Sequence, residues 1–273
     1  MLRKLIKYEI LADWKKYGIV SAALILISIM LLIVDKMSAL VVNSQFIVYI
    51  SMILSIVFFA LAAVAAAMLF VFATIRFYKG FIRDEGYLMH TLPVPTWQLI
   101  ASNLIAVYIW VILLVAVLII CGGIAMGKPM WLFYFIDHRG ELVDSLAVQF
   151  GSEATRYLIR IFGITAILTF ISPALYMAHT YFSFALGNLF SRNKLAISVL
   201  MFFVISFVEQ ILLAIVSFPF LLKLMPIVDD ASVEQSFKIA VDSSVLSIIF
   251  SVIVAIGYLI AAERIFAKKL NLE

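Results

Sequence analysis

The chain has 273 residues, of which 66% are hydrophobic and only 13% are charged. Soluble domains are about 45–50% apolar and about 25% charged, so this composition excludes a water-soluble globular protein and indicates a polytopic membrane protein. The net charge is +4, and the single cysteine, Cys121, excludes an internal disulfide framework. No soluble domain fits between the apolar segments, so a soluble catalytic module would have to be a separate chain.

Six apolar segments are long enough to cross a hydrocarbon core, which takes about 20 helical residues. Backbone that spans a membrane must be helical or form a closed barrel, and barrel strands would alternate in polarity over about ten residues. The uninterrupted apolar character therefore predicts an all-α protein with a single transmembrane domain over residues 1–273. The predicted spans lie near residues 17–34, 46–75, 97–126, 160–184, 195–222 and 244–262.

Lysine and arginine are distributed unevenly between the two sides that these spans define. Thirteen of the 20 lie before the first span, in the second and fourth loops, or after the last span, and seven lie on the other side. Cytoplasmic segments of membrane proteins carry an excess of Lys and Arg. We therefore expect a multi-pass protein of the cell membrane with both termini in the cytoplasm and with loops one, three and five outside.

The segment before the first span, residues 1–16, mixes apolar and basic residues. Its apolar residues recur mainly at three- and four-residue steps, with Lys and Glu at the other positions. This pattern predicts an amphipathic helix in the inner membrane interface, with Trp14 and Tyr17 at headgroup depth. The alternative is an ordinary basic flank of the first span. The apolar positions are Leu2, Leu5, Ile6, Ile10, Trp14 and Tyr17.

Loop two, residues 76–96, carries the most information about function. Gly80 and Gly86 loosen the helix that continues from span two, and Pro93 and Pro95 redirect the chain into span three. Between them, two long helices hold a short apolar group with a polar edge on the cytoplasmic side. Such a group can dock into a cleft on a partner protein or lie on the lipid surface, and composition leaves both interpretations open. Its apolar residues are Tyr87, Leu88, Met89 and Leu92.

The order of residues in this loop resembles the loop between spans two and three in ABC-2 type transporter permeases, notably those of Gram-positive anaerobic bacteria. In those families an acidic residue, Gly-Tyr-Leu and Thr-Leu-Pro follow one another. More weakly, the whole chain is similar to them in its basic N-terminal segment, its six spans and its short basic fourth loop. The matching residues here are Glu85, Gly86, Tyr87, Leu88, Thr91, Leu92 and Pro93.

The resemblance implies that residues 76–96 form a coupling helix that touches a separate ATP-binding subunit. It also implies a unit of two permease chains, identical or different, with two ATP-binding subunits, and short re-entrant helices before the last span. ATP and Mg²⁺ would then be bound by the partner, so this chain would need no cofactor and would not be an enzyme. Many relatives carry a lysine where this chain has Asn103, a difference to which we attach no function. The expected contact residues are Asp84, Glu85, Gly86, Tyr87, Leu88, Thr91 and Leu92.

Two further patterns are explained by helix packing. The segment from Gly122 to Pro129 nearly matches a nucleotide-binding P-loop, but Pro129 replaces the hydroxyl residue that holds Mg²⁺ and no strand precedes the segment. We discard a nucleotide site there, because Gly123 and Gly127 more simply permit close packing or end the helix. Span two also holds alanines that would pack against a second permease chain or a neighbouring span, at positions 60, 62, 63, 65, 66 and 67.

Glu209 is the acidic residue that lies well inside a span, about 21 Å from the inner end of span five. A carboxylate near the bilayer centre costs about 3 kcal/mol, so it should face a wet cavity unless it is protonated or partnered. We expect Glu209 either to line the translocation path or to lie near outer-surface water in a re-entrant part of span five. Pro219 and Pro226 would permit the second arrangement.

His179 is expected toward the inner end of span four, at a depth different from that of Glu209. Since no HExxH motif, cysteine pair or carboxylate cluster accompanies His179, the sequence offers no metal site, and a packing role is the simpler interpretation. Pro173 should kink span four. Loop three, residues 127–159, is expected to be the longest outside loop, with its acidic residues facing solvent.

These observations favour the permease subunit of an ATP-driven ABC-2 exporter that moves an amphipathic or hydrophobic cargo, such as a peptide antibiotic or a lipid, out of the cell. An ion- or proton-coupled carrier is the alternative. It needs titratable residues at mid-membrane, and five of the predicted spans hold no Asp, Glu or Lys. An intramembrane enzyme would need catalytic groups at one depth, which Glu209 and His179 are not expected to share. No nucleic-acid partner is expected.

Overall fold

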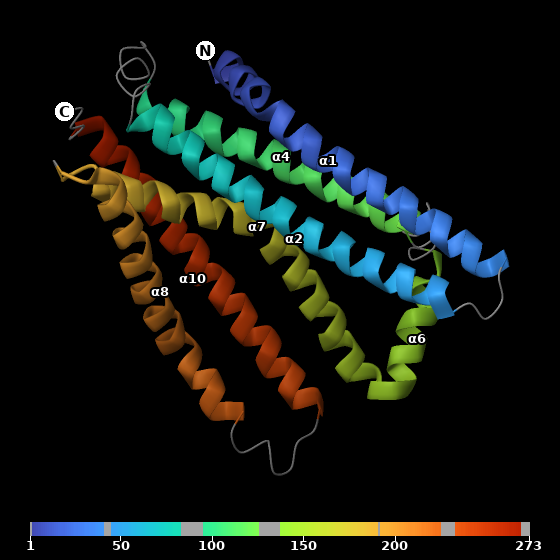
Figure 1. Ribbon diagram of the computed structural model, residues 1–273. Coiled ribbons are helices and arrows are strands. Elements are labelled where there is room, and N and C mark those ends of the chain that lie inside the picture. The colour runs from blue at the N-terminus through green and yellow to red at the C-terminus, as the bar shows by residue number, and fades with distance from the viewer. Residues whose placement is uncertain are drawn as a thin grey trace. The chain divides into compact units, whose positions relative to one another are not determined.

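The computed structural model describes residues 2–40, 45–82, 95–125, 137–190, 192–224 and 233–268. Within these ranges six helices are long and apolar enough to cross a membrane, which confirms the predicted spans and the all-α architecture of a multi-pass membrane protein (Figure 1). Most of these helices extend beyond their apolar segments, because helical hydrogen bonding continues into the polar flanks. The helices are α1 (Leu2–Leu40), α2 (Gln45–Phe81), α4 (Thr96–Ala125), α6 (Arg139–Phe150), α7 (Ser152–Gly187), α8 (Lys194–Leu224) and α10 (Val233–Lys268).

The helices divide into two compact units. Unit 1 comprises Met1–Arg76 and Gln98–His138, and it therefore contains α1, most of α2 and most of α4. Unit 2 comprises Phe77–Trp97 and Arg139–Glu273, and it contains the end of α2 together with α6, α7, α8 and α10. Each unit has its own set of packing contacts, and the two are described separately below.

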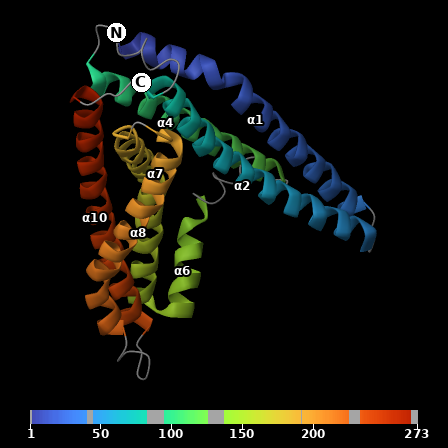
Figure 2. The same cartoon turned by 60° about the vertical axis from the view of Figure 1, so that its left-hand side comes forward.

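In unit 1, α1, α2 and α4 lie side by side (Figures 1 and 2). Leu24 and Leu31 of α1 meet Phe58 and Ala65 of α2 and Cys121 of α4, and all five side chains are buried. The two residues from α1 are seven positions apart, as are the two from α2, which is the spacing that returns to the same face of a helix. The core of unit 1 is therefore one apolar stripe from each helix.

The alanine segment of α2 contributes to this core along one face. Ala65 is buried in it and Ala62 packs against it, whereas Ala60, Ala63 and Ala67 are exposed. These alanines were expected to pack against a second permease chain or against a neighbouring span. In this structure Ala62 and Ala65 pack against neighbouring helices of the same chain. The small side chains let these helices approach closely.

Helix α1 is continuous from Leu2 to Leu40, so residues 1–16 do not form an element separate from the first span. The predicted interfacial helix is therefore not confirmed. Trp14 is exposed, but Tyr17 is packed inside unit 1: its ring centroid lies 4.4 Å from that of Trp110, and its hydroxyl donates a hydrogen bond to the Leu69 carbonyl oxygen at 3.2 Å. No proline interrupts this segment, so the helix has no local reason to end before the span.

Helix α6 is the first helix in the Arg139–Glu273 part of unit 2. Together with the start of α7 it occupies much of the segment expected as loop three. The described part of the expected outside segment 127–159 is therefore largely helical. Glu141 in the first turn of α6 suits the positive end of a helix dipole. Gly151 joins α6 to α7 with a φ of 88°, a conformation that glycine adopts without steric cost.

Helices α7, α8 and α10 pack on one another in unit 2. Helix α7 changes direction partway along its length (Figure 1), and Pro173, which cannot donate a backbone hydrogen bond, lies inside it. Helix α8 runs without a break from Lys194 to Leu224, through Pro219. The residues between α8 and α10, 225–232, lie outside the described part of the chain, and so does any re-entrant helix expected there.

Candidate functional site

The residues expected to contact an ATP-binding subunit lie outside the described part of the chain. The structure instead describes the end of α2, which leads into that segment, and the start of α4, which follows it. Two polar clusters are candidate functional sites: one around Arg76 in unit 1 and one around Glu209 in unit 2. The residues outside the description are Asp84, Glu85, Gly86, Tyr87, Leu88, Thr91 and Leu92.

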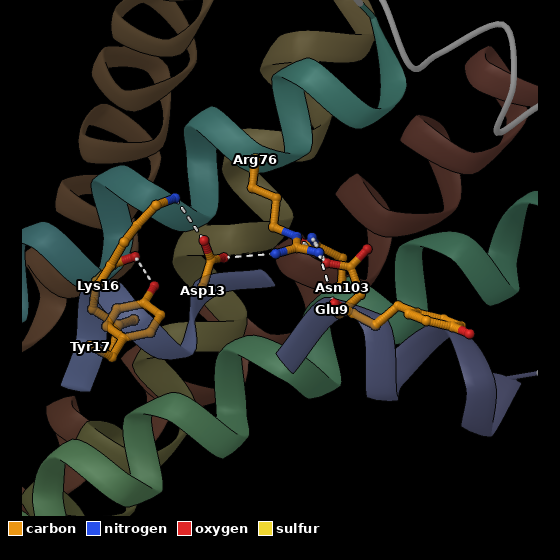
Figure 3. Close-up of polar contacts among 8 residues, drawn as sticks. Glu9, Asp13, Lys16, Tyr17, Arg76 and Asn103 are labelled. Atoms are coloured by element: carbon orange, nitrogen blue, oxygen red, sulfur yellow. Dashed lines mark hydrogen bonds and ion pairs between the residues drawn. The ribbon is translucent and has the colours of Figure 1, made fainter. Parts of the chain in front are cut away.

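Arg76, the first residue of the 76–96 segment, extends from α2 to two carboxylates of α1 (Figure 3). Its Nε forms an ion pair with Glu9 Oε2, and its Nη1 lies 3.0 Å from Asp13 Oδ2. Glu9 and Asp13 are four residues apart, which places both on one face of α1. Their side chains are only 12% and 7% exposed, so both carboxylates need a nearby cation, and Arg76 supplies one to each.

Two further side chains complete this network (Figure 3). Lys16 Nζ lies 2.7 Å from Asp13 Oδ1, and the Lys16 side chain is half exposed. Asn103 of α4 donates a long hydrogen bond of 3.5 Å to Glu9 Oε2. The charges of Arg76 and Lys16 balance those of the two carboxylates, so the network is electrically neutral and links α1, α2 and α4. Its chemistry suits helix attachment better than ligand binding.

The sequence pattern did not predict this network, because the Lys and Glu residues before span one were expected on the polar side of an interfacial helix. A usable signal was present: Glu9 and Asp13 follow Ile6 and Ile10 at three-residue steps, and so lie on the predicted apolar face. Acidic residues on such a face require a cation, and Arg76 is a basic residue at the end of predicted span two that is expected to face the cytoplasm. Asn103, to which we attached no function, is the neighbour of Glu9.

Two aromatic residues of α2 after Arg76 are buried in unit 2. Phe77 and Phe81 are only 1% and 2% exposed. The ring centroid of Phe77 lies 4.1 Å from that of Tyr181 in α7, and the centroid of Phe81 lies 5.5 Å from that of Phe266 in α10. Aromatic pairs at such separations contribute about 0.5–1.5 kcal/mol each beyond the burial of their surface. The last turn of α2 is thus firmly packed within this unit.

In the other cluster, Glu209 of α8 contacts His179 of α7, and the expectation that these residues lie at different depths is wrong. His179 Nδ1 lies 3.0 Å from Glu209 Oε2, and His179 Nε2 lies 3.1 Å from the Phe202 carbonyl oxygen and 3.2 Å from Ser206 Oγ. Helical side chains lean toward the N-terminus of their own helix, so Glu209 reaches back along α8 toward Ser206. The depths expected from the sequence were residue counts along each span, and such counts do not include the direction in which a side chain extends.

This contact gives Glu209 a partner that can share a proton. A carbonyl oxygen only accepts hydrogen bonds, so the contact with Phe202 requires a proton on His179 Nε2. Either His179 then carries protons on both ring nitrogens beside an ionised Glu209, or Glu209 carries the proton and donates it to Nδ1. The side chains of His179 and Glu209 are 10% and 27% exposed, and the ring of Tyr258 lies 5.7 Å from that of His179.

No protein-family profile, curated protein or solved structure matches this chain. Among the described residues, no group of three or more His, Cys, Asp or Glu side chains is placed to hold a metal ion. A functional assignment therefore rests on the two polar clusters, on the span architecture and on the residues of loop two.

Proposed function

We propose that this chain is the permease subunit of an ATP-driven ABC-2 exporter in the cell membrane, with both termini in the cytoplasm. Two permease chains and two ATP-binding subunits would form the working unit, and the cargo would be an amphipathic or hydrophobic molecule. ATP and Mg²⁺ would act in the partner subunit. The permease would contribute a coupling contact through residues 76–96 and a translocation path that includes Glu209.

The observation that supports this proposal is the packing of α2 directly before the coupling segment. Arg76 is held by two carboxylates in unit 1, and Phe77 and Phe81 are buried in unit 2. Within unit 2, bending of α2 between Phe77 and Phe81 would expose this aromatic surface, so the last turn of α2 resists bending. A displacement that reaches Phe81 would therefore be passed to α7 and α10, against which this turn packs.

The test uses the coupling segment itself. Truncating a buried aromatic anchor at an interface typically costs about 2 kcal/mol or more, which is roughly thirtyfold in affinity. The double variant Tyr87→Ala/Leu88→Ala should therefore lose copurification with the ATP-binding subunit or uncouple ATP hydrolysis from transport. Pull-down and cargo-stimulated ATPase rates measure these two properties.

A matched control lies at the other end of α2. Val48 and Tyr49 are both exposed, and the variant Val48→Ala/Tyr49→Ala removes the same kinds of side chain at a distance from the coupling segment. The control should copurify with the ATP-binding subunit as the wild type does. Wild-type association and coupling in the Tyr87/Leu88 variant would show that this segment does not transmit force, and the exporter assignment would lose its main support.

The pair of His179 and Glu209 favours a second candidate, a proton-coupled carrier. Two titratable side chains in direct contact inside predicted spans are the feature that such carriers need. The two functions differ in their energy source. Cargo movement in proteoliposomes that contain only this chain, driven by a pH gradient, would support the carrier; movement that requires the ATP-binding subunit and ATP would support the exporter.

A further inference from the structure

A cavity of about 260 Å³ lies among α7, α8 and α10 of unit 2, and hydroxyl groups line much of it. Thr165 comes from α7, and the serines come from consecutive turns of α10. Leu213 of α8 and aliphatic residues of α7 and α10 complete the wall. The hydroxyl residues are Thr165, Ser243, Ser244, Ser247 and Ser251.

Four of these hydroxyl groups donate their hydrogen atom to a carbonyl oxygen of their own helix. Thr165 donates to the Ile161 carbonyl oxygen at 2.8 Å, and Ser247 donates to the Ser243 carbonyl oxygen at 2.8 Å. Ser243 and Ser244 both donate to the carbonyl oxygen of Ala240. A hydroxyl group has one hydrogen and two lone pairs, so what these residues can still offer is acceptor oxygen. The cavity is therefore suited to a ligand that donates hydrogen bonds.

A larger, mainly apolar cavity of about 470 Å³ adjoins this one. Ser243 lines both cavities, and Ala214 of the larger one follows Leu213 of the smaller one in α8. Phe218, Phe220 and Leu221 supply most of the bulky apolar side chains of the larger cavity. Together the two cavities form an amphipathic site, with acceptor oxygens in one part and apolar surface in the other.

Glu209 places a carboxylate near the acceptor-lined cavity. It precedes Leu213 by one turn of α8, which is about 6 Å along the helix axis. Its Oε2 faces His179, whereas its Oε1 has no hydrogen-bond partner among the described residues. His179 compensates the charge of this carboxylate, so what Glu209 adds near the cavity is a further acceptor oxygen. A hydrogen bond to it from a charged donor is stronger than one from a neutral donor.

We propose that these two cavities bind an amphipathic molecule with a protonated amine, whose N–H groups meet the hydroxyl oxygens of α7 and α10 and whose apolar body lies against α8. The binding site itself stands on the cavities and their chemistry. That its ligand is the transported cargo rests on the proposed function. A quaternary ammonium carries the charge but no N–H donor, and an alcohol carries a donor but no charge, so both should bind more weakly than a primary amine with the same alkyl chain.

The experiment measures equilibrium binding of labelled dodecylamine to the purified full chain in phosphatidylcholine nanodiscs, with empty nanodiscs subtracted. Unlabelled dodecylamine, dodecyltrimethylammonium and dodecanol compete for the site. Hydrogen bonds to charged groups are worth about 1.5–3 kcal/mol, so dodecylamine should compete at least about tenfold better than either analogue. Equal competition by all three compounds would mean apolar adsorption without recognition of the amine, and would overturn the proposal.

Variants test the residues themselves. Glu209→Gln keeps the shape of the side chain and should weaken dodecylamine binding by about tenfold. Ser247→Ala removes one acceptor and should weaken it by severalfold, while Ser247→Leu fills the cavity and should abolish it. Ser51→Ala is the matched control, because Ser51 donates to a carbonyl of its own helix in the same way but lies on α2 in unit 1. Unchanged binding in both Glu209→Gln and Ser247→Ala would contradict the proposal.

The measurement needs no ATP-binding subunit, so it separates this inference from the proposed function. Amine-specific binding without any copurifying ATP-binding protein would support the binding site and contradict the proposed exporter function. Copurification of an ATP-binding protein without amine-specific binding would support the exporter function and contradict the binding site.

Discussion

Arg76 compensates two carboxylates that are almost withdrawn from solvent. Removing one partner of a buried ion pair leaves an uncompensated charge, and this costs about 3–5 kcal/mol when the site is fully buried. Arg76 is 24% exposed, so solvent screens part of that cost. The pair of Lys16 and Asp13 differs, because the half-exposed Lys16 can be replaced by water at little cost.

We therefore expect Arg76→Gln to lower the free energy of unfolding by about 2–3 kcal/mol, and Lys16→Gln by less than about 1 kcal/mol. Glu9→Gln should partly relieve the effect of Arg76→Gln, because Lys16 still compensates Asp13 and Glu9 is the carboxylate left without a cation. A double-mutant cycle on unfolding in detergent measures this coupling. Additive effects of the two substitutions would mean that the ion pair contributes nothing to stability.

The contact between Glu209 and His179 allows a structural role to be separated from a transport role. If Glu209 lines the path, Glu209→Gln should change the transport rate and leave association with the ATP-binding subunit intact. If its role is only to hold α8 against α7, the same variant should lower the unfolding midpoint and leave the transport rate of the folded protein unchanged. A normal transport rate would remove Glu209 from the path.

Helices α7 and α8 approach closely where Gly187 faces Ser198. A Cβ atom added at Gly187 would lie 2.7 Å from the Ser198 Cα atom, a separation at which backbone must move. Ser198 is buried and donates a hydrogen bond to the Lys194 carbonyl oxygen, so it has little freedom to yield. The absence of a side chain at Gly187 thus sets the spacing of these two helices.

Gly187→Ala should destabilise the protein by about 1–3 kcal/mol, the usual cost of overpacking. Gly163→Ala in the same helix is the control: nothing lies within 4 Å of an added Cβ there, and alanine favours a helix by up to about 1 kcal/mol over glycine. Thermal unfolding of the two variants in detergent should show opposite signs. A neutral Gly187→Ala would mean that α7 and α8 can separate without loss.

For the whole molecule, the distribution of Lys and Arg predicts which ends of the helices face the cytoplasm. Asp144 of α6 and Arg192, between α7 and α8, lie on opposite predicted sides, and both are exposed to a labelling reagent. In a Cys121→Ser background, Asp144→Cys should react with a membrane-impermeant thiol reagent in intact cells, and Arg192→Cys should react only after permeabilisation. The reverse pattern would invert the topology and place residues 76–96 outside, where no ATP-binding subunit could reach them.

The sequence alone determined that the chain lies in a lipid membrane and that it spans it with helices. So many apolar side chains can be kept from water only by lipid, and the long uninterrupted apolar segments satisfy their backbone hydrogen bonds in lipid as helices. It located Glu209 and Pro173 correctly within helices, since both are properties of local sequence. It did not reveal that Glu9 and Asp13 meet Arg76, that Glu209 meets His179, or that Gly187 faces Ser198. Each of these is a contact between helices, and it depends on how far the helices are rotated and shifted along their axes. Packing of all the side chains together sets these quantities, so only the tertiary structure decided them.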